Sequence, residues 1–475
     1  MFSVFSRAGR RGRVTARLAA AALASGLVAT GAISGAGAAV ADDGVREQGG
    51  ASATISGLET YGEAVVHRDG QDEKVSAGLF RMTVDGGGTL QTYCIDLHNP
   101  TQTEAKYQET PWSGTSLGGN PAAGKIRWIL QNSYPQVNDL AALARKARTG
   151  SLTEQDAAAG TQVAIWRYSD QADVDAVSPA AEKLADYLHK SARSLTEPQA
   201  SLTLSPQAVS GHPGERLGPV TVHTNAESLT VTPPAEAAAG GVKVVDKDGT
   251  PVTSATDGSR IYFDVPADAA SGSAALTVQG STTVPVGRAF ASDTRSQTQV
   301  LAGSSESTVS ATATATWAKE GAVPALYARK NCAAGGVDIT ATNKGDEPFS
   351  FRLMGTRHTI PAESSRTVTI PLQEDQAYDF TIKGPNGFEK RLRGVLDCKT
   401  ASAATAADDG LTTQTTTQPS PASVGGTGTA GTDLAETGSS NATPVIAGIA
   451  IVLVLVGGVS VVLGRKKKAS SSDGE

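Results

Sequence analysis

The spacing of apolar residues changes twice along this chain, and these two changes constrain its fold more than any single motif. Residues 52–97 alternate apolar and polar side chains, which is the period of a half-buried β-strand. Residues 121–195 instead repeat apolar positions at the spacing of an amphipathic helix. From residue 199 to residue 398 the pattern returns to short alternating runs separated by turn residues. We therefore predict a multidomain protein, with an α+β domain first and all-β modules after it.

The α+β domain is predicted to span residues 52–196, with its strands before its helices. Thr153 and Asp156 form a capping-box pattern, and Ser178 followed by Pro179 is typical of a helix start. The predicted strands are 53–66, 75–84 and 89–97, and the predicted helices are 121–130, 140–148, 153–169 and 178–192.

Two Ig-like β-sandwich modules are predicted after this domain, over residues 199–318 and 325–398. Cys332 and Cys398 bracket the second module, so a disulfide between them would close nearly all of it. Loop-closure entropy predicts that such a disulfide stabilises the module by roughly 4 kcal/mol. The alternative is a pair of free thiols, which is unusual outside the cell.

The N-terminal segment, residues 1–41, has the composition of a secretory signal peptide. A basic start is followed by an Ala-rich apolar run, and Ala39-Val40-Ala41 fits the small-residue cleavage rule. The alternative is an N-terminal membrane anchor, which the many Gly and Ala residues of the run disfavour. We expect the mature protein to be secreted.

The C-terminal part contains a spacer, an apolar run and a basic tail. Residues 399–433 are rich in Thr, Ala, Gly and Ser, a composition that predicts a disordered spacer across the cell wall. Residues 444–463 are apolar and long enough for one transmembrane helix. The basic residues of 464–475 predict a cytoplasmic tail, because positive charge stays inside.

Charge and residue usage exclude several classes of function. The formal net charge is −6, and most of the basic clusters lie in the two targeting ends. The mature part is therefore acidic, which argues against nucleic acid as a partner. The six histidines are far apart, so the sequence predicts no metal site and no cofactor. We also predict no catalytic residues in the enzymatic sense, because no base or family signature of a cysteine hydrolase surrounds Cys94.

Cys94 is the one cysteine that the predicted disulfide leaves without a partner. Gln162 is a polar residue in the predicted helix 153–169, on the same side as Ala158 and Trp166. A thiol can attack a carboxamide carbon and expel ammonia, giving a thioester. The reaction becomes feasible when the fold holds both groups in contact, polarises the amide oxygen and excludes water.

Each residue of this pair also has an ordinary structural interpretation. Cys94 can be an inert buried thiol or can form an intermolecular disulfide, and Gln162 can be a hydrogen-bonded core amide. Thr161 either donates a hydrogen bond near the site or bonds to a helix carbonyl. Trp166 either packs in the core or shields the site from water. The remaining polar neighbours are Asp96 and His98, which either carry protons or lie on the surface.

Two short motifs resemble those of thioester domains in Gram-positive surface adhesins. Thr161-Gln162-Val163-Ala164-Ile165-Trp166 is similar to their Thr-Gln-x-Ala motif, and Tyr93-Cys94-Ile95-Asp96 is similar to their upstream cysteine motif. The resemblance covers roughly residues 52–195. It implies a thioester cross-link between Cys94 and Gln162, with Tyr93, Asp96, Thr161 and Trp166 as supporting residues. It also implies that a lysine amine of a target attacks the thioester, leaving an amide bond to Gln162.

Leu434-Ala435-Glu436-Thr437-Gly438 resembles a sortase sorting signal, since it stands just before the apolar run and the basic tail. Ala435 replaces the more common Pro, as in signals of class E sortases from actinobacteria. The resemblance implies cleavage after Thr437 and attachment to peptidoglycan, with membrane insertion only before sorting. The alternative is a plain C-terminal membrane anchor.

Two functions from different classes remain. The first is a wall-anchored adhesin that uses the Cys94–Gln162 thioester once to link covalently to an amine-bearing ligand. The second is a structural or non-covalent binding protein of the wall with an unreactive site. Since no catalyst is regenerated in the first, neither function is enzymatic.

Overall fold

The computed structural model describes residues 49–68, 70–233 and 240–400 of the 475-residue chain. The predicted signal peptide, the sorting motif, the apolar run, the basic tail and residues 401–433 of the spacer lie outside these ranges. Within the described ranges, no helix has the length and apolar character needed to cross a membrane.

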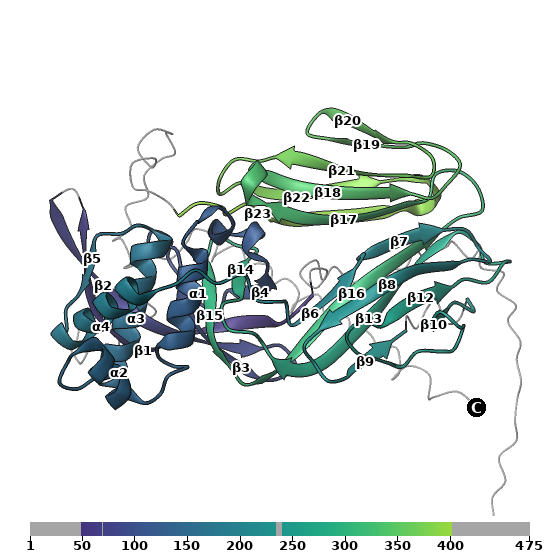
Figure 1. The fold of residues 1–475 in the computed structure, drawn as a ribbon. Coiled ribbons are helices and arrows are strands. Elements are labelled where there is room, and N and C mark those ends of the chain that lie inside the picture. The colour runs from purple at the N-terminus through teal and green to yellow at the C-terminus, as the bar shows by residue number, and fades with distance from the viewer. Residues whose placement is uncertain (1–48, 69, 234–239, 401–475) are drawn as a thin grey trace, which may run out of the picture. The chain divides into compact units, whose positions relative to one another are not determined.

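A seven-stranded sheet forms the first part of the described chain (Figure 1). Its strands are β1 (Ser52–Arg68), β2 (Gln71–Val84), β3 (Thr89–Cys94), β4 (Lys106–Thr110), β5 (Val174–Ala176), β14 (Ala289–Ser292) and β15 (Gln299–Ser304). Strand β1 pairs with β2 and, at its start, also with β4. The strand order β1-β2-β3-β15-β14-β4 therefore closes into a ring of six strands, and β5 is added outside the ring along β1.

Four α-helices follow β4 in the chain, the first and third of which contact strands of the ring. They are α1 (Ala123–Asn132), α2 (Leu140–Ala147), α3 (Glu154–Ser169) and α4 (Pro179–Ser191), preceded by the short 3-10 turns η2 (Trp112–Gly114) and η3 (Ser116–Gly119). The Thr153–Asp156 capping box is confirmed at the start of α3. Helix α3 contacts β1, β2 and α4, and its residues 157–166 are all buried. A Cβ on Gly160 would lie 2.5 Å from the Ala181 carbonyl oxygen, so glycine lets α4 approach α3 closely.

The predicted boundaries of the first two domains need one correction, because β14 and β15 belong to the first sheet. The sequence pattern places both strands in the module at 199–318 and limits the first domain to 52–196. In the structure, β13 (Gly272–Thr283) and β16 (Glu306–Trp317) pair along their whole length, and the chain between them carries β14 and β15. This β14–β15 hairpin completes the ring. Alternation shows that a segment is a strand but not which sheet it joins, so the pattern left this undetermined.

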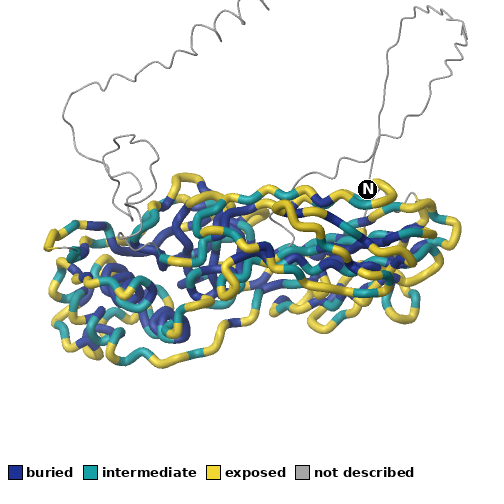
Figure 2. The backbone as a smooth tube through the Cα atoms, turned by 90° about the horizontal axis from the view of Figure 1, so that it is seen from above, coloured by how far each residue is buried: buried dark blue, intermediate teal, exposed yellow. Residues whose placement is uncertain are grey.

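The second part of the chain contains two sheets, as expected for an all-β module. One has the order β10-β12-β8-β6 and the other β11-β9-β13-β16-β7. Their strands are β6 (Leu202–Ser205), β7 (Ala208–Gly211), β8 (Arg216–Thr224), β9 (Leu229–Thr232), β10 (Lys243–Val245), β11 (Ser254–Ala255) and β12 (Arg260–Asp264), with β13 and β16. One hydrophobic core runs through this module and the first domain (Figure 2). The two parts are therefore packed together as well as joined by the hairpin.

The third part, residues 324–398, has a core of its own. A three-stranded sheet and two hairpins are built from β17 (Pro324–Asn331), β18 (Gly336–Asn343), β19 (Phe349–Leu353), β20 (Thr356–Ile360), β21 (Ser364–Pro371), β22 (Ala377–Lys383) and β23 (Glu389–Val395), with the short turns η4 (Cys332–Ala334) and η5 (Pro385–Gly387). The structure contains a Cys332–Cys398 disulfide that closes this module, and Cys94 is a free, buried cysteine.

Candidate functional site: the Cys94–Gln162 contact

Cys94 and Gln162 meet where strand β3 loses one of its neighbours. Pairing of β2 with β3 ends at Phe80 and Thr92, because β2 then turns away to pair only with β1. The backbone of Cys94 would therefore have unpaired polar groups on that side. The side-chain amide of Gln162, from the middle of α3, takes the place of the missing strand.

Both halves of the Gln162 amide bind the backbone of Cys94. The Cys94 N–H donates to Gln162 Oε1 at 3.1 Å, and Gln162 Nε2 donates to the Cys94 carbonyl oxygen at 2.8 Å. Both residues are completely buried. This is the bonding of a satisfied core amide, and it also holds the carboxamide beside the one free thiol of the described residues.

Trp166, one helical turn after Gln162, contacts the sulfur itself. Its indole Nε1–H donates to Cys94 Sγ at 3.1 Å, and the side chain is fully buried. Burial raises the pKa of the Cys94 thiol well above its ordinary value, the nearby carboxyl of Asp170 raises it further, and the Trp166 hydrogen bond partly offsets both. The thiol is therefore protonated in the resting site, and the indole is placed to stabilise negative charge on sulfur.

The β14–β15 hairpin holds the other side of the Cys94 loop. Gln299 lies opposite Cys94 in the β3–β15 pairing, and the Ile95 N–H donates to the Thr298 carbonyl at 3.1 Å. Gln297 Nε2 donates to the Asp96 carbonyl, and Gln297 is fully buried. The backbone is thus bound at Cys94 and Leu97 by side chains of α3 and its C-cap, and at Ile95 and Asp96 by residues of the hairpin loop.

Two acidic residues lie beside this loop. Asp96 is buried and accepts from the His98 N–H at 3.3 Å and from Asn99 Nδ2. Asp170, the C-cap of α3, accepts from the Leu97 N–H at 2.9 Å and from the Ser169 hydroxyl at 2.5 Å. Burial raises the pKa of Asp96 to about 8, with a further contribution from Asp170, and it raises the pKa of Asp170 to about 7.

The other predicted supporting residues have mainly structural contacts. Thr161 donates to the Ala157 carbonyl at 2.7 Å, which is the helix-carbonyl alternative. The Tyr93 hydroxyl donates to the Tyr134 carbonyl at 2.9 Å and is fully buried. His98 pairs with Arg68, and burial lowers the pKa of His98 to about 4, so its imidazole is neutral at pH 7.

Sequence reasoning missed Asp170, Gln297 and Gln299. Asp170 had a signal, because it follows Gln162 and Trp166 at successive four-residue steps and so lies near their side of the helix. The two glutamines had none, because they stand far along the chain in a segment assigned to another module.

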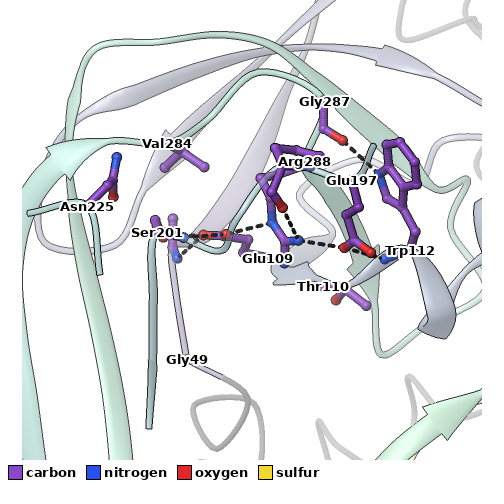
Figure 3. A network of polar contacts seen from close by, with 12 residues as sticks. Gly49, Glu109, Thr110, Trp112, Glu197, Ser201, Asn225, Val284, Gly287 and Arg288 are labelled. Carbon is purple, nitrogen blue, oxygen red and sulfur yellow. Dashed lines mark hydrogen bonds and ion pairs between the residues drawn. The ribbon is translucent and has the colours of Figure 1, made fainter. Parts of the chain in front are cut away.

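A second buried polar network joins the hairpin to the first domain (Figure 3). Arg288 Nε donates to Glu109 Oε1 at 2.9 Å, and the two side chains are only 5% and 1% exposed. Arg288 Nη1 donates to Glu197 at 2.7 Å, and the Ser201 N–H donates to Glu109 at 2.9 Å. The network connects β4, the segment after α4 and the start of the hairpin, so two of the three crossings between the first domain and the second module, after α4 and from β13 into β14, are fixed at one place.

Comparison with known proteins gives two family matches. The thioester-domain family model matches residues 91–194, and that of the C-terminal domain of bacterial phospholipase C matches residues 322–395. No curated protein matches the chain.

Two solved structures are similar to parts of this chain, and one of them is a thioester domain by name. The Bacillus anthracis TIE protein is 16% identical with a TM-score of 0.26, over 73% of this chain and 64% of that chain. The thioester domain of the Enterococcus faecium TIE86 protein is 16% identical with a TM-score of 0.26, over 57% of this chain and 97% of that one. This chain thus spans just under two thirds of the Bacillus anthracis protein. The family match carries the likeness: residues 91–194, with Cys94 and Gln162 among them, are similar to a thioester domain.

Proposed function

We propose that this protein is a cell-surface adhesin that links covalently to an amine-bearing target through a Cys94–Gln162 thioester. The observation that carries the proposal is the bonding of the Gln162 amide to the Cys94 backbone, with no solvent at either residue. Wall anchoring by a sortase rests on the sorting motif alone and is part of the same proposal.

Thioester formation requires that Cys94 Sγ attack Gln162 Cδ. Negative charge then develops on Oε1, which already accepts the Cys94 N–H at 3.1 Å, in the manner of an oxyanion site. The C–N bond breaks, and the amide nitrogen leaves as ammonia with the thiol proton. Since the Gln162 amide is already bound to the backbone of Cys94, little further ordering of the two groups is needed.

In the reaction with the target, Cys94 sulfur is the leaving group instead of the nucleophile. An uncharged lysine amine attacks Cδ, the C–S bond breaks, and Sγ leaves with the proton lost by the amine. The indole of Trp166 stabilises the sulfur as it leaves. Burial protects the thioester from water, so the amine reaches Cδ only when the elements covering the site move apart.

Intact mass of the secreted protein tests the proposal. A thioester lowers the mass by one ammonia, and Cys94→Ala and Gln162→Ala should each abolish this loss. Methylamine should add to Gln162 of the native protein and raise its mass by one methylamine. Cys94 should then be alkylatable after denaturation. Full mass and an alkylatable Cys94 in freshly purified, denatured protein would contradict the proposal.

The second candidate function is a structural or non-covalent binding protein with an unreactive site. It is favoured by the same two hydrogen bonds, because they satisfy Gln162 completely as a core amide. Under this alternative, Gln162→Ala changes stability but leaves no difference in ammonia loss between variant and native protein.

A further inference from the structure

Asp170 is an acidic residue beside the Cys94–Gln162 contact, and the proposed thioester chemistry gives it no role. It stands at the end of α3, the helix that carries Gln162, and its carboxylate accepts the Leu97 N–H at 2.9 Å, three residues after Cys94. Asp170 and Gln162 therefore tie the same two elements together at two points. The hydrogen bonds between Gln162 and Cys94 change when the Gln162 amide reacts. The hydrogen bond from the Leu97 N–H to Asp170 involves no reacting atom.

We propose that Asp170 is a positioning residue for the Cys94–Gln162 reaction, and that its charge sets how readily Cys94 sulfur leaves. This inference rests on the proposed thioester. The carboxylate holds the Cys94 loop against α3 in both the amide and the thioester states. When ionised, it opposes negative charge on Sγ, so cleavage of the C–S bond by an amine becomes slower.

The surroundings of Asp170 support a change in the ionisation of its carboxyl near neutral pH. Its hydrogen-bond partners, the Leu97 N–H and the Ser169 hydroxyl, are neutral donors, so neither compensates an ionised carboxylate. Of the titratable groups around it, Cys94 and Asp96 lie on the β3 side, and Asp397 acts on Asp96. On α1, Lys125 lies over the Tyr168 ring, and Arg68, at the end of β1, pairs with His98. Burial raises the pKa of Asp170 to about 7, which places its ionisation in the physiological range.

The test measures cleavage of the thioester by hydroxylamine, with each rate constant expressed per concentration of the uncharged amine at that pH. In the native chain, we expect the rate constant to fall as pH rises through about 7, by up to about ten-fold for one pKa unit in the leaving thiol. Asp170→Asn keeps an acceptor for the Leu97 N–H but cannot ionise, so its profile should be flat in this window. Asp170→Ala also removes the acceptor of the Leu97 N–H. We expect only part of this variant to lose ammonia.

A matched control is Asp173→Asn, which removes an exposed acid three residues further along the same segment. Its profile should follow that of the native chain. Ammonia loss by Asp170→Asn shows that this variant folds and reacts, even where Asp170→Ala does not fold. A native chain without ammonia loss overturns the proposed function and this role together. Ammonia loss in both, with the same pH profile for Asp170→Asn and the native chain, overturns only the role of Asp170.

Discussion

At the residue scale, the chemistry of the site depends on hydrogen bonds that reach one sulfur and one carboxamide. The amide oxygen of Gln162 has its donor in the backbone of Cys94, so no substitution of a side chain removes that donor. The sulfur has its donor in Trp166, which a substitution can remove. The two contributions can therefore be separated by experiment.

Trp166→Phe should slow cleavage of the thioester by methylamine while leaving the hydrophobic packing largely in place. A hydrogen bond to a charged group contributes about 1.5–3 kcal/mol, so the rate should fall roughly ten-fold or more. Intact-mass spectra of samples quenched at successive times measure the rate. Trp112→Phe is the control, because its indole donates to the Gly287 carbonyl away from the sulfur. Equal rates for Trp166→Phe and native protein would show that the indole only packs.

At the scale of elements, the site is built by one helix, one strand and a hairpin from far along the chain. The β14–β15 hairpin contributes no reacting atom, yet it holds the backbone of Ile95 and Asp96 from the side opposite α3. We therefore expect the hairpin to influence thioester yield.

Gln297→Met removes the amide that binds the Asp96 carbonyl but keeps the length of the side chain. We predict a mixture of proteins with and without ammonia loss, because the Cys94 loop is less well held, and intact mass gives the fractions. Gln136→Met is the control, since Gln136 donates to the Ala302 carbonyl at the far end of the same hairpin. Complete ammonia loss in Gln297→Met would mean that α3 alone positions the loop.

Arg288→Met should destabilise the first domain, because it leaves the carboxylate of Glu109 buried without its cation. Removing one partner of a buried ion pair costs about 3–5 kcal/mol. Arg81→Met is the matched control, since its pair with Glu59 is exposed and should contribute at most about 1 kcal/mol. Thermal or urea unfolding of both variants measures the difference, and equal losses would contradict the importance of burial.

At the scale of the whole molecule, the first two parts share one hydrophobic core and the third has another. Two carboxyls whose pKa is raised on folding, Asp96 to about 8 and Asp170 to about 7, lie in the first core region. Their folded pKa lies above the unfolded value, so the unfolded chain ionises first as pH rises. The free energy of unfolding should therefore fall between about pH 4 and pH 8.

Asp96→Asn should remove part of this pH dependence, because the amide stays neutral in both states. We expect the variant to unfold at a higher temperature than native protein at pH 8, with the difference vanishing toward pH 4. Thermal unfolding followed across this range measures it. Asp173→Asn again serves as the control, and a constant difference between Asp96→Asn and native protein at every pH would contradict the assignment.

The sequence by itself determined the types of element and the two residues of the candidate cross-link. The capping box of Thr153 and Asp156 predicts the start of α3, because its hydrogen bonds act within a few residues. The motifs around Cys94 and Gln162 resemble those of thioester domains, and both residues lie within the segment that matches that family model.

Only the tertiary structure decided which strands surround that pair. A strand carries no record in its own residues of the sheet that it will join, because backbone pairing is the same in every sheet. Thus the β14–β15 hairpin appeared to belong to the following module, and Gln297 and Gln299 could not be connected with Cys94. The Asp170 tie to Leu97 also depends on where β3 ends relative to α3, which is a property of packing between distant segments rather than of either segment alone.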